Sequence, residues 1–242
     1  MVFSSLPFLF LFLTVVLLVS HILPFRFRNF FLLLANLVFY AYGEPVYVLI
    51  MIGSILVNFF AGLLMDKQST QGRRRAVLVV GIVLNLAALG VFKYAGLFVS
   101  TLREIPGLSS LPEVDIALPI GISFYTFQAV SYLIDVYWDD CAASHNLINF
   151  ASYISLFPQL IAGPIVRYKD VNEQLVSRRE TPTLFNSGVR LFVVGLAKKV
   201  LLANQFGMLW DAMSADPVAA GALGAWAGAC AYTLQIYFDF AG

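Results

Sequence analysis

Two apolar segments carry polar side chains at helical spacing, and these side chains could do chemistry inside a membrane. The first segment runs from Leu118 to Trp138. One of its faces is formed by residues that follow one another at intervals of four, three, four and three positions, namely Gly121, Tyr125, Gln128, Tyr132 and Asp135. The terminal segment repeats this arrangement with Gly228, Tyr232, Gln235 and Asp239. A helix turns by about 100° per residue, so such spacing keeps the residues on one side. Lipid cannot satisfy polar groups, and the two faces therefore predict a polar inner seam or tunnel.

Helix packing is the alternative explanation for these faces. Small residues let helices approach closely, and Gln, Tyr and Ser side chains can form hydrogen bonds across the contact. Ser123 and Thr126 are expected to point away from the first polar face. The carboxylates of Asp135 and Asp239 fit packing less well, because a carboxylate at membrane depth needs a partner or a function. Asp135 lies near the predicted inner end of its helix, where water could solvate it, so both explanations stay open.

Candidate catalytic groups are few. His21 and His145 have no Ser, Cys or carboxylate neighbour at a spacing that indicates a proton relay. The two cysteines, Cys141 and Cys230, lie far apart, which predicts neither a disulfide framework nor a zinc site. The motifs of serine hydrolases, zinc proteases and nucleotide-binding loops do not occur in the sequence. We therefore expect no catalytic residue, no metal site and no bound cofactor in this sequence.

The composition indicates which elements must position these residues. Hydrophobic residues make up 60% of the chain and charged residues only 12%, with a mean hydropathy of +0.83. Soluble domains carry roughly 25% charged residues, so the chain is predicted to be an all-α polytopic membrane protein. The formal net charge of +1 gives no argument for nucleic acid as a partner. No repeat or linker divides the sequence, and we expect one membrane domain over residues 1–242 with about six to eight membrane-embedded segments.

Basic residues predict the orientation of these segments. They gather at Arg26 and Arg28, in Lys67–Arg75 and in Arg167–Arg179, and the positive-inside rule places all three groups on the cytoplasmic side. The amino terminus is then periplasmic, and Met1–Ser20 lacks the cleavage site of a removed signal. The predicted crossings are Phe3–Leu23, Phe30–Tyr42, Val46–Met65, Ala76–Ser100, Leu118–Trp138 and a last one from about Ala219. Phe185–Asn204 carries Arg190, Lys198 and Lys199, which favours a helix at the cytoplasmic interface.

One apolar segment is interrupted. Residues 149–165 contain Pro158 and the pair Gly163–Pro164, and cytoplasmic segments flank them on both sides. The segment must then enter the membrane and return on the same side. Irregular backbone at membrane depth is tolerated where it is buried in protein or lines a wet cavity, so this re-entrant segment is predicted to line the interior.

The chain ends within an apolar segment that has just presented Gln235 and Asp239. Intramembrane polar groups need partners, and we expect the chain to be the amino-terminal part of a longer polytopic protein. Part of the chemistry is then expected beyond Gly242.

Several ordered motifs resemble the membrane-bound O-acyltransferase family. They are Leu118–Gln128 (LPIGISFYTFQ), Phe157–Ile165 (FPQLIAGPI), Gly195–Lys199 (GLAKK) and Gln235–Gly242 (QIYFDFAG). Met1–Ser5 and Phe92–Tyr94 are also similar to its bacterial branch that O-acetylates alginate and related exopolysaccharides. The resemblance covers essentially the whole chain.

This resemblance implies a helical bundle around a tunnel in the bacterial inner membrane, here truncated at its carboxyl end. An acyl group, expected to be acetyl, passes from a cytoplasmic donor to hydroxyls of an extracytoplasmic polysaccharide such as alginate. The donor is acetyl-CoA or a carried acyl group, and periplasmic acetylation accessory proteins are expected as partners besides membrane lipid. The family histidine follows a Trp-rich motif downstream of Gln235–Gly242, so it lies beyond residue 242. We expect the chain to be inactive alone.

The polar faces, the interrupted segment and the basic residues supply two groups of candidate site residues for such a tunnel. The expected tunnel-lining residues are Tyr125, Gln128, Tyr132, Pro158, Gln159, Gly163, Pro164, Gln235 and Asp239. At the cytoplasmic mouth, Arg167, Lys169, Lys198 and Lys199 could meet an anionic donor or carrier. Their alternative roles are orientation signals and lipid-headgroup contacts.

Other functions stay open at this point. A related branch transfers D-alanine to teichoic acids. A transporter would use the polar faces to line a solute path, although inverted repeats with paired interrupted helices would then be expected. A purely structural membrane scaffold leaves the depth of Gln235 and Asp239 unexplained.

Overall fold

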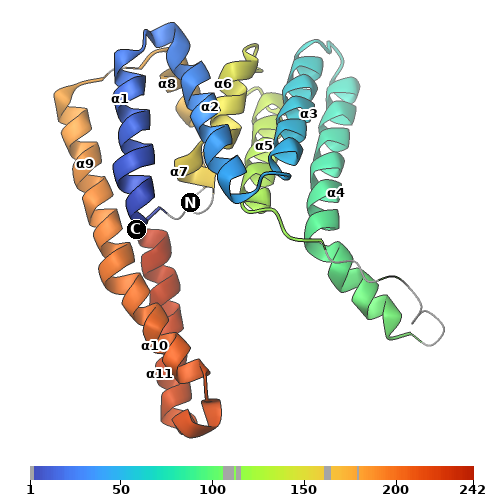
Figure 1. The fold of residues 1–242 in the computed structure, drawn as a ribbon. Coiled ribbons are helices and arrows are strands. Elements are labelled where there is room, and N and C mark those ends of the chain that lie inside the picture. Colours follow the sequence, from blue (N-terminus) through green and yellow to red (C-terminus); the bar gives the residue numbers. More distant parts are fainter. Residues whose placement is uncertain (1–2, 106–111, 113–115, 161–164, 179) are drawn as a thin grey trace. The chain divides into compact units, whose positions relative to one another are not determined.

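The computed structural model covers residues 1–242 and describes all but residues 1–2, 106–111, 113–115, 161–164 and 179 (Figure 1). Every regular element in the described part is helical, which confirms the all-α prediction. Two of the elements, η1 and η2, are π-helical. The elements are η1 Pro7–Leu13, α1 Thr14–Ile22, α2 Phe25–Gly43, α3 Val48–Asp66, α4 Gln71–Arg103, α5 Ile122–Tyr137, α6 Leu147–Ser155, α7 Phe157–Leu160, α8 Tyr168–Val176, α9 Pro182–Ala197, η2 Lys198–Ala203, α10 Asn204–Ser214 and α11 Pro217–Ala241.

The helices form two compact units. The first spans Val15–Arg178, and the second combines Val2–Thr14 with Arg179–Gly242. The single membrane domain over residues 1–242 stays a prediction.

The described helices include three stretches that are long and apolar enough to cross a membrane, Val48–Asp66, Gln71–Arg103 and Pro182–Ser214. Their length and apolar character support the prediction of a membrane protein. The third stretch contains Phe185–Asn204, which the sequence places at the interface. Its length and composition also permit a crossing, so the interfacial position stays a prediction.

Helix α2 is longer than the segment predicted from apolar residues alone. The sequence predicts Phe30–Tyr42, whereas the helix begins at Phe25 after Pro24 and has 19 residues. Arg28 lies in its first turns and donates from Nε to the carbonyl of Leu23 at 2.8 Å. The helix thus includes the basic residues Arg26 and Arg28, and the charged end of Arg28 bonds to the preceding backbone.

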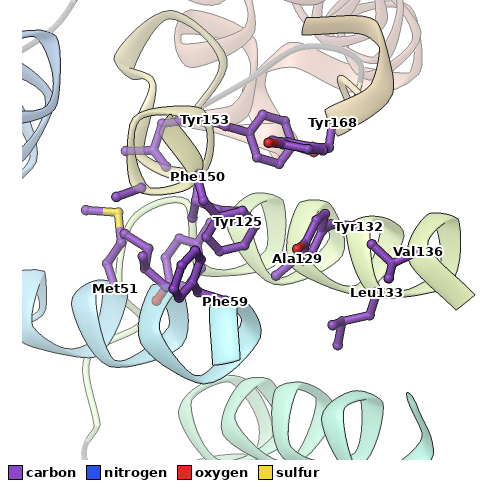
Figure 2. Packing of buried hydrophobic residues seen from close by; sticks show 14 of the residues in the cluster. Met51, Phe59, Tyr125, Ala129, Tyr132, Leu133, Val136, Phe150, Tyr153 and Tyr168 are labelled. Carbon is purple, nitrogen blue, oxygen red and sulfur yellow. The ribbon is translucent and has the colours of Figure 1, made fainter. Parts of the chain in front are cut away.

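The core of the first unit is aromatic (Figure 2). Helix α5 lies among α3, α4, α6 and α8 and contributes Tyr132, which is fully buried. The Tyr132 ring centroid lies 4.6 Å from that of Phe150 on α6 and 5.1 Å from that of Tyr168 on α8. Tyr153 extends the cluster, with its ring centroid 5.2 Å from that of Tyr168. Such tilted and edge-to-face pairs contribute roughly 0.5–1.5 kcal/mol each beyond the burial of their area.

Glycines let the helices approach this core closely. A Cβ atom built on Gly62 of α3 would lie 2.9 Å from Cε1 and Cζ of Tyr132. A Cβ atom on Gly81 of α4 would lie 2.6 Å from Cδ1 of Leu133. Small residues at such contacts permit the close helix packing on which membrane bundles depend.

We predict that Gly62→Ala destabilises the protein by about 1–3 kcal/mol, because the added methyl group meets the buried Tyr132 ring. Gly53→Ala on the same helix is the matched control, since a Cβ atom there has nothing within 4 Å. Thermal unfolding of the purified protein in detergent, followed by circular dichroism, compares the two. Equal midpoints for both variants would contradict the close α3–α5 contact.

Candidate functional site

Helix α5 begins at a backbone position that requires glycine. Gly121 has a φ of 76°, in the left-handed region, and precedes the helix as its N-cap. A Cβ atom on Gly121 would lie only 2.6 Å from the carbonyl oxygen of Leu160 at the end of α7. Residues with a side chain rarely adopt this backbone conformation. The glycine thus allows the chain to turn and the neighbouring backbone to approach closely. Gly121 therefore positions the polar face of α5 and is not a member of the helix itself.

The polar face predicted for α5 lies inside the first unit. Tyr125 and Gln128 are 1% exposed, Tyr132 is 0% exposed and Asp135 is 2% exposed. Thr126, which the sequence places away from this face, is also buried at 2%. Helices α3, α4, α6 and α8 all contact α5, so it buries residues on several sides and not along one stripe alone.

The polar groups of this face differ in how they are satisfied. The Tyr132 hydroxyl accepts a hydrogen bond from the backbone N–H of Ser144 at 3.0 Å. The Tyr125 hydroxyl, Oε1 of Gln128 and Oδ2 of Asp135 are buried and make no hydrogen bond within the described part of the chain. A buried polar group without a partner costs roughly 1–3 kcal/mol. The unpaired atoms of Tyr125 and Gln128, three residues apart on α5, indicate a place where water or a ligand supplies the missing bonds.

Helix α2 adds two residues that the sequence analysis missed. Asn36 and Tyr40 are 0% and 4% exposed, and Asn36 Nδ2 and the Tyr40 hydroxyl also lack partners among the described residues. The Tyr40 hydroxyl lies close to that of Tyr125, so these two buried hydroxyls are polar neighbours of each other beside α5. The spacing of four residues between Asn36 and Tyr40 in an apolar segment is the same signal that identified the face of α5, and it could have identified them.

The interrupted segment is broken at Leu156, two residues before Pro158. Helix α6 ends at Ser155 and α7 begins at Phe157, whose N–H donates to Oδ1 of Asn36 at 3.3 Å. The side chain of Gln159 is half-buried and donates from Nε2 to the carbonyl of Tyr153 at 2.8 Å, whereas Pro158 is exposed. Gly163 and Pro164 lie outside the described residues. The re-entrant path therefore stays a prediction.

The three basic groups predicted to be cytoplasmic contribute side chains to one end of the first unit. Arg178 donates to Oδ1 of Asn29 at 2.8 Å, and Asn29 donates to the carbonyl of Leu175 at 2.7 Å, so the start of α2 lies beside the end of α8. Arg74 lies 2.6 Å from Asp139, and Lys169 lies 3.2 Å from Asp140. Figure 1 shows the α1–α2 and α3–α4 connections and α8 at this end. One shared end for the three basic groups is what a single cytoplasmic side requires.

Carboxylates occupy the same end. The guanidinium of Arg74 holds the pKa of Asp139 below its ordinary value through their hydrogen bond. A pocket of about 300 Å³ lies beside this pair and is lined by Asp66, Arg74, Val136, Asp139, Cys141, Ala142 and Ala143. His145 lies at the surface with Nε2 3.4 Å from Asp66. Within the described residues, no three His, Cys, Asp or Glu side chains gather as metal ligands.

In the second unit, the terminal polar face lies largely in a helix contact. Helix α11 packs against α10 and η2, and the Trp210 and Tyr232 rings lie with centroids 5.0 Å apart. A Cβ atom on Gly207 would lie 3.0 Å from Nε2 of Gln235, and one on Gly228 would lie 3.4 Å from Trp210. Close packing thus accounts for Gly228. It leaves Oε1 of Gln235 buried without a hydrogen bond from any described residue.

Asp239 has a partner in the same unit. Its carboxylate pairs with Nζ of Lys199, and Nζ of Lys198 donates to the carbonyl of Ala241 at 2.9 Å. Both lysines begin η2, whose wider π-helical turn presents two consecutive side chains to α11. Such π-helical turns are frequent at functional sites. The proposed roles of Lys198 and Lys199 at a cytoplasmic mouth stay predictions.

Comparisons with known proteins show which family the chain resembles. The sequence model of the membrane-bound O-acyltransferase family matches residues 141–242. The chain is 43% identical over 248 residues to the "Probable alginate O-acetylase AlgI" of Pseudomonas aeruginosa, an alignment that covers 100% of this chain and 47% of that protein. It is 31% identical to the "Peptidoglycan O-acetyltransferase" of Helicobacter pylori, covering 89% of this chain and 46% of that protein.

A more distant relative is the "Teichoic acid D-alanyltransferase" of Streptococcus thermophilus, which is 31% identical over 130 residues, 51% of this chain and 31% of that protein. The chain spans about half the length of the first curated relatives that it matches. No solved structure matches it.

We predict that Gln128→Leu leaves the stability of the protein unchanged or raises it by up to about 1–3 kcal/mol, because it removes a buried acceptor that has no partner. Tyr132→Phe is the contrasting variant, since it leaves the buried N–H of Ser144 unpaired and is expected to lower stability by about the same amount. Chemical unfolding in mixed detergent micelles measures both changes. A large loss of stability in Gln128→Leu would show that the amide is a packing element.

Proposed function

This chain belongs to the membrane-bound O-acyltransferase family, and from that premise we propose that it takes part in moving an acetyl group from a cytoplasmic donor to hydroxyls of an extracytoplasmic polysaccharide. The donor is acetyl-CoA or a carried acetyl group, and the acceptor is alginate or a similar exopolysaccharide. The observation that carries the proposal is 43% identity to a probable alginate O-acetylase along the whole chain.

The other relatives support the same type of reaction. The peptidoglycan and teichoic acid enzymes are also named for acyl transfer to polymers of the cell envelope. The acetyltransferase matches cover 100% and 89% of this chain, whereas the D-alanyltransferase match covers 51%. Acetyl transfer is therefore favoured, and D-alanyl transfer to teichoic acid is the second candidate.

The chemistry of acyl transfer favours a role in substrate binding for the polar residues of α5. Acyl transfer to a hydroxyl needs a base for the proton and hydrogen-bond donors for the developing oxyanion. His145 lies exposed beside Asp66 at the charged end of the first unit, and it is a poor candidate for the base. The polar face of α5 offers a phenol and an amide in an interior without bulk water, where hydrogen bonds to a substrate are strong. We assign Tyr125 and Gln128 to binding a polar part of a substrate, and no catalytic base to the described residues.

The proposal places the protein in the bacterial inner membrane with a periplasmic amino terminus. Arg167 and Lys169 would then lie at the cytoplasmic end of the first unit, where an anionic donor arrives. The polysaccharide and the periplasmic acetylation accessory proteins would meet the opposite side. The three basic groups at one end of the first unit support this orientation.

We predict that the natural gene encoding this chain restores O-acetyl groups to alginate in Pseudomonas aeruginosa that lacks its own relative. In the same assay, Gln128→Leu should lower the acetyl content by about tenfold or more, since it removes a hydrogen-bonding group from the substrate path. The matched control is Phe127→Leu, because Phe127 lies on the same helix and is 45% exposed. Acetyl content is measured by nuclear magnetic resonance of the purified polymer, at equal membrane levels of each protein.

Two results would contradict this assignment. Polymer without acetyl groups, despite normal protein in the membrane, would exclude alginate O-acetylation in this host. Normal acetylation by Gln128→Leu would reduce the α5 face to packing. D-alanine esters on teichoic acid, measured in a Gram-positive host that lacks its D-alanyltransferase, would support the second candidate.

A further inference from the structure

Three carboxylates at the end of α5 each face a cation from another segment. Asp139 lies 2.6 Å from Arg74 of α4, and Asp140 lies 3.2 Å from Lys169 of α8. Asp135 lies 4.0 Å from Arg167, which directly precedes α8. Two of the predicted mouth residues, Arg167 and Lys169, are therefore held next to carboxylates and not left alone in solvent.

The Asp135–Arg167 pair differs from its neighbours. The Asp135 side chain is 3% exposed and its Oδ2 has no hydrogen bond within the described residues, whereas the Arg167 side chain is 51% exposed. A separation of 4.0 Å exceeds the 2.7–3.2 Å of an N–H···O hydrogen bond. The carboxylate is thus buried and incompletely satisfied, and its cation lies half in solvent.

Such a pair has two competing requirements. A buried carboxylate is costly unless a cation or a donor approaches it closely. An exposed guanidinium binds carboxylate and phosphate with the same planar fork, so a phosphate in solution competes directly for it. The exposed position of Arg167 lets it turn toward either partner, and Lys169 supplies a second positive charge two residues away.

We propose that Asp135 restrains Arg167 as a latch, and that a phosphate group of the soluble acyl donor opens the latch by taking Arg167 from Asp135. The assignment of the phosphate to an acyl donor rests on the proposed function. The competition between Asp135 and a phosphate for Arg167 does not. Asp135 is therefore a positioning residue. It keeps Arg167 near the mouth, and it weakens phosphate binding because a phosphate must displace it from Arg167. Asp140 holds Lys169 in the same way at shorter range.

The test is a binding measurement that needs no acyl transfer. The purified full chain in phosphatidylcholine nanodiscs is titrated with inorganic pyrophosphate by calorimetry at low ionic strength. Asp135→Asn removes the competing charge with the same shape, and it should lower the Kd for pyrophosphate by about three- to tenfold. Arg167→Gln should raise the Kd by about tenfold or more, and the effect of Asp135→Asn should disappear in the double variant.

Asp139→Asn is the matched control. It removes a carboxylate from the same end of the unit, yet its partner is Arg74, so the Kd should stay within about twofold of the parent value. A Kd that rises or does not change in Asp135→Asn overturns the latch. Should Asp135→Asn fail to fold, Asp135→Glu keeps the charge and brings it nearer to Arg167; a raised Kd then supports the proposal, and an unchanged or lowered Kd overturns it.

A second arm separates a soluble donor from a lipid headgroup. If the site serves a soluble donor, the Kd for pyrophosphate in phosphatidylglycerol nanodiscs still differs between Asp135→Asn and the parent protein. Loss of that difference, with retention in phosphatidylcholine, shows that an anionic lipid headgroup occupies Arg167 and overturns the donor assignment. Failure of the latch leaves the acetylation assay unaffected, and failure of acetylation leaves the pyrophosphate result valid.

Discussion

The structure of the first unit depends on one constraint, namely that polar groups among apolar helices must find partners within the protein. Helix α5 meets this constraint only in part. Tyr132 is bonded to the backbone of Ser144, while Tyr125, Gln128 and Asp135 each keep a buried atom without a partner in the described chain. Membrane interiors supply no water to relieve such groups. Their persistence beside a tightly packed aromatic core is the strongest sign that α5 serves binding as well as packing.

The two predicted polar faces differ in how far packing and pairing within their own units satisfy their polar groups. In the first unit, unsatisfied groups from α2 and α5 accumulate around Tyr40 and Tyr125. In the second, close packing at Gly207 and Gly228 and the Lys199–Asp239 pair account for most of the face on α11. Helix packing, the alternative for both faces, thus explains more of the second than of the first. Gln235 is the exception, because its oxygen remains buried and unbonded to described residues.

Periodicity in the sequence was enough to predict the face of α5 that holds Tyr125, Gln128 and Tyr132, but it left open whether water solvates Asp135, which is buried. It could not predict which carboxylate meets which cation, because Arg74, Lys169 and Arg167 reach the end of α5 from distant segments. The sequence places Thr126 away from the polar face but does not predict its burial, which arises because helices contact α5 on several sides. The π-helical turn at Lys198–Ala203 was also missed, since wheel arithmetic presumes 3.6 residues per turn.

The most direct test of the account is a high-resolution electron cryo-microscopy structure of the protein in a lipid nanodisc. We predict density for an ordered water or a polar ligand within hydrogen-bonding distance of Oε1 of Gln128 and of the Tyr125 hydroxyl. A dry interior in which both groups bond only to neighbouring side chains would contradict the account, and the polar face of α5 would then be an element of packing alone.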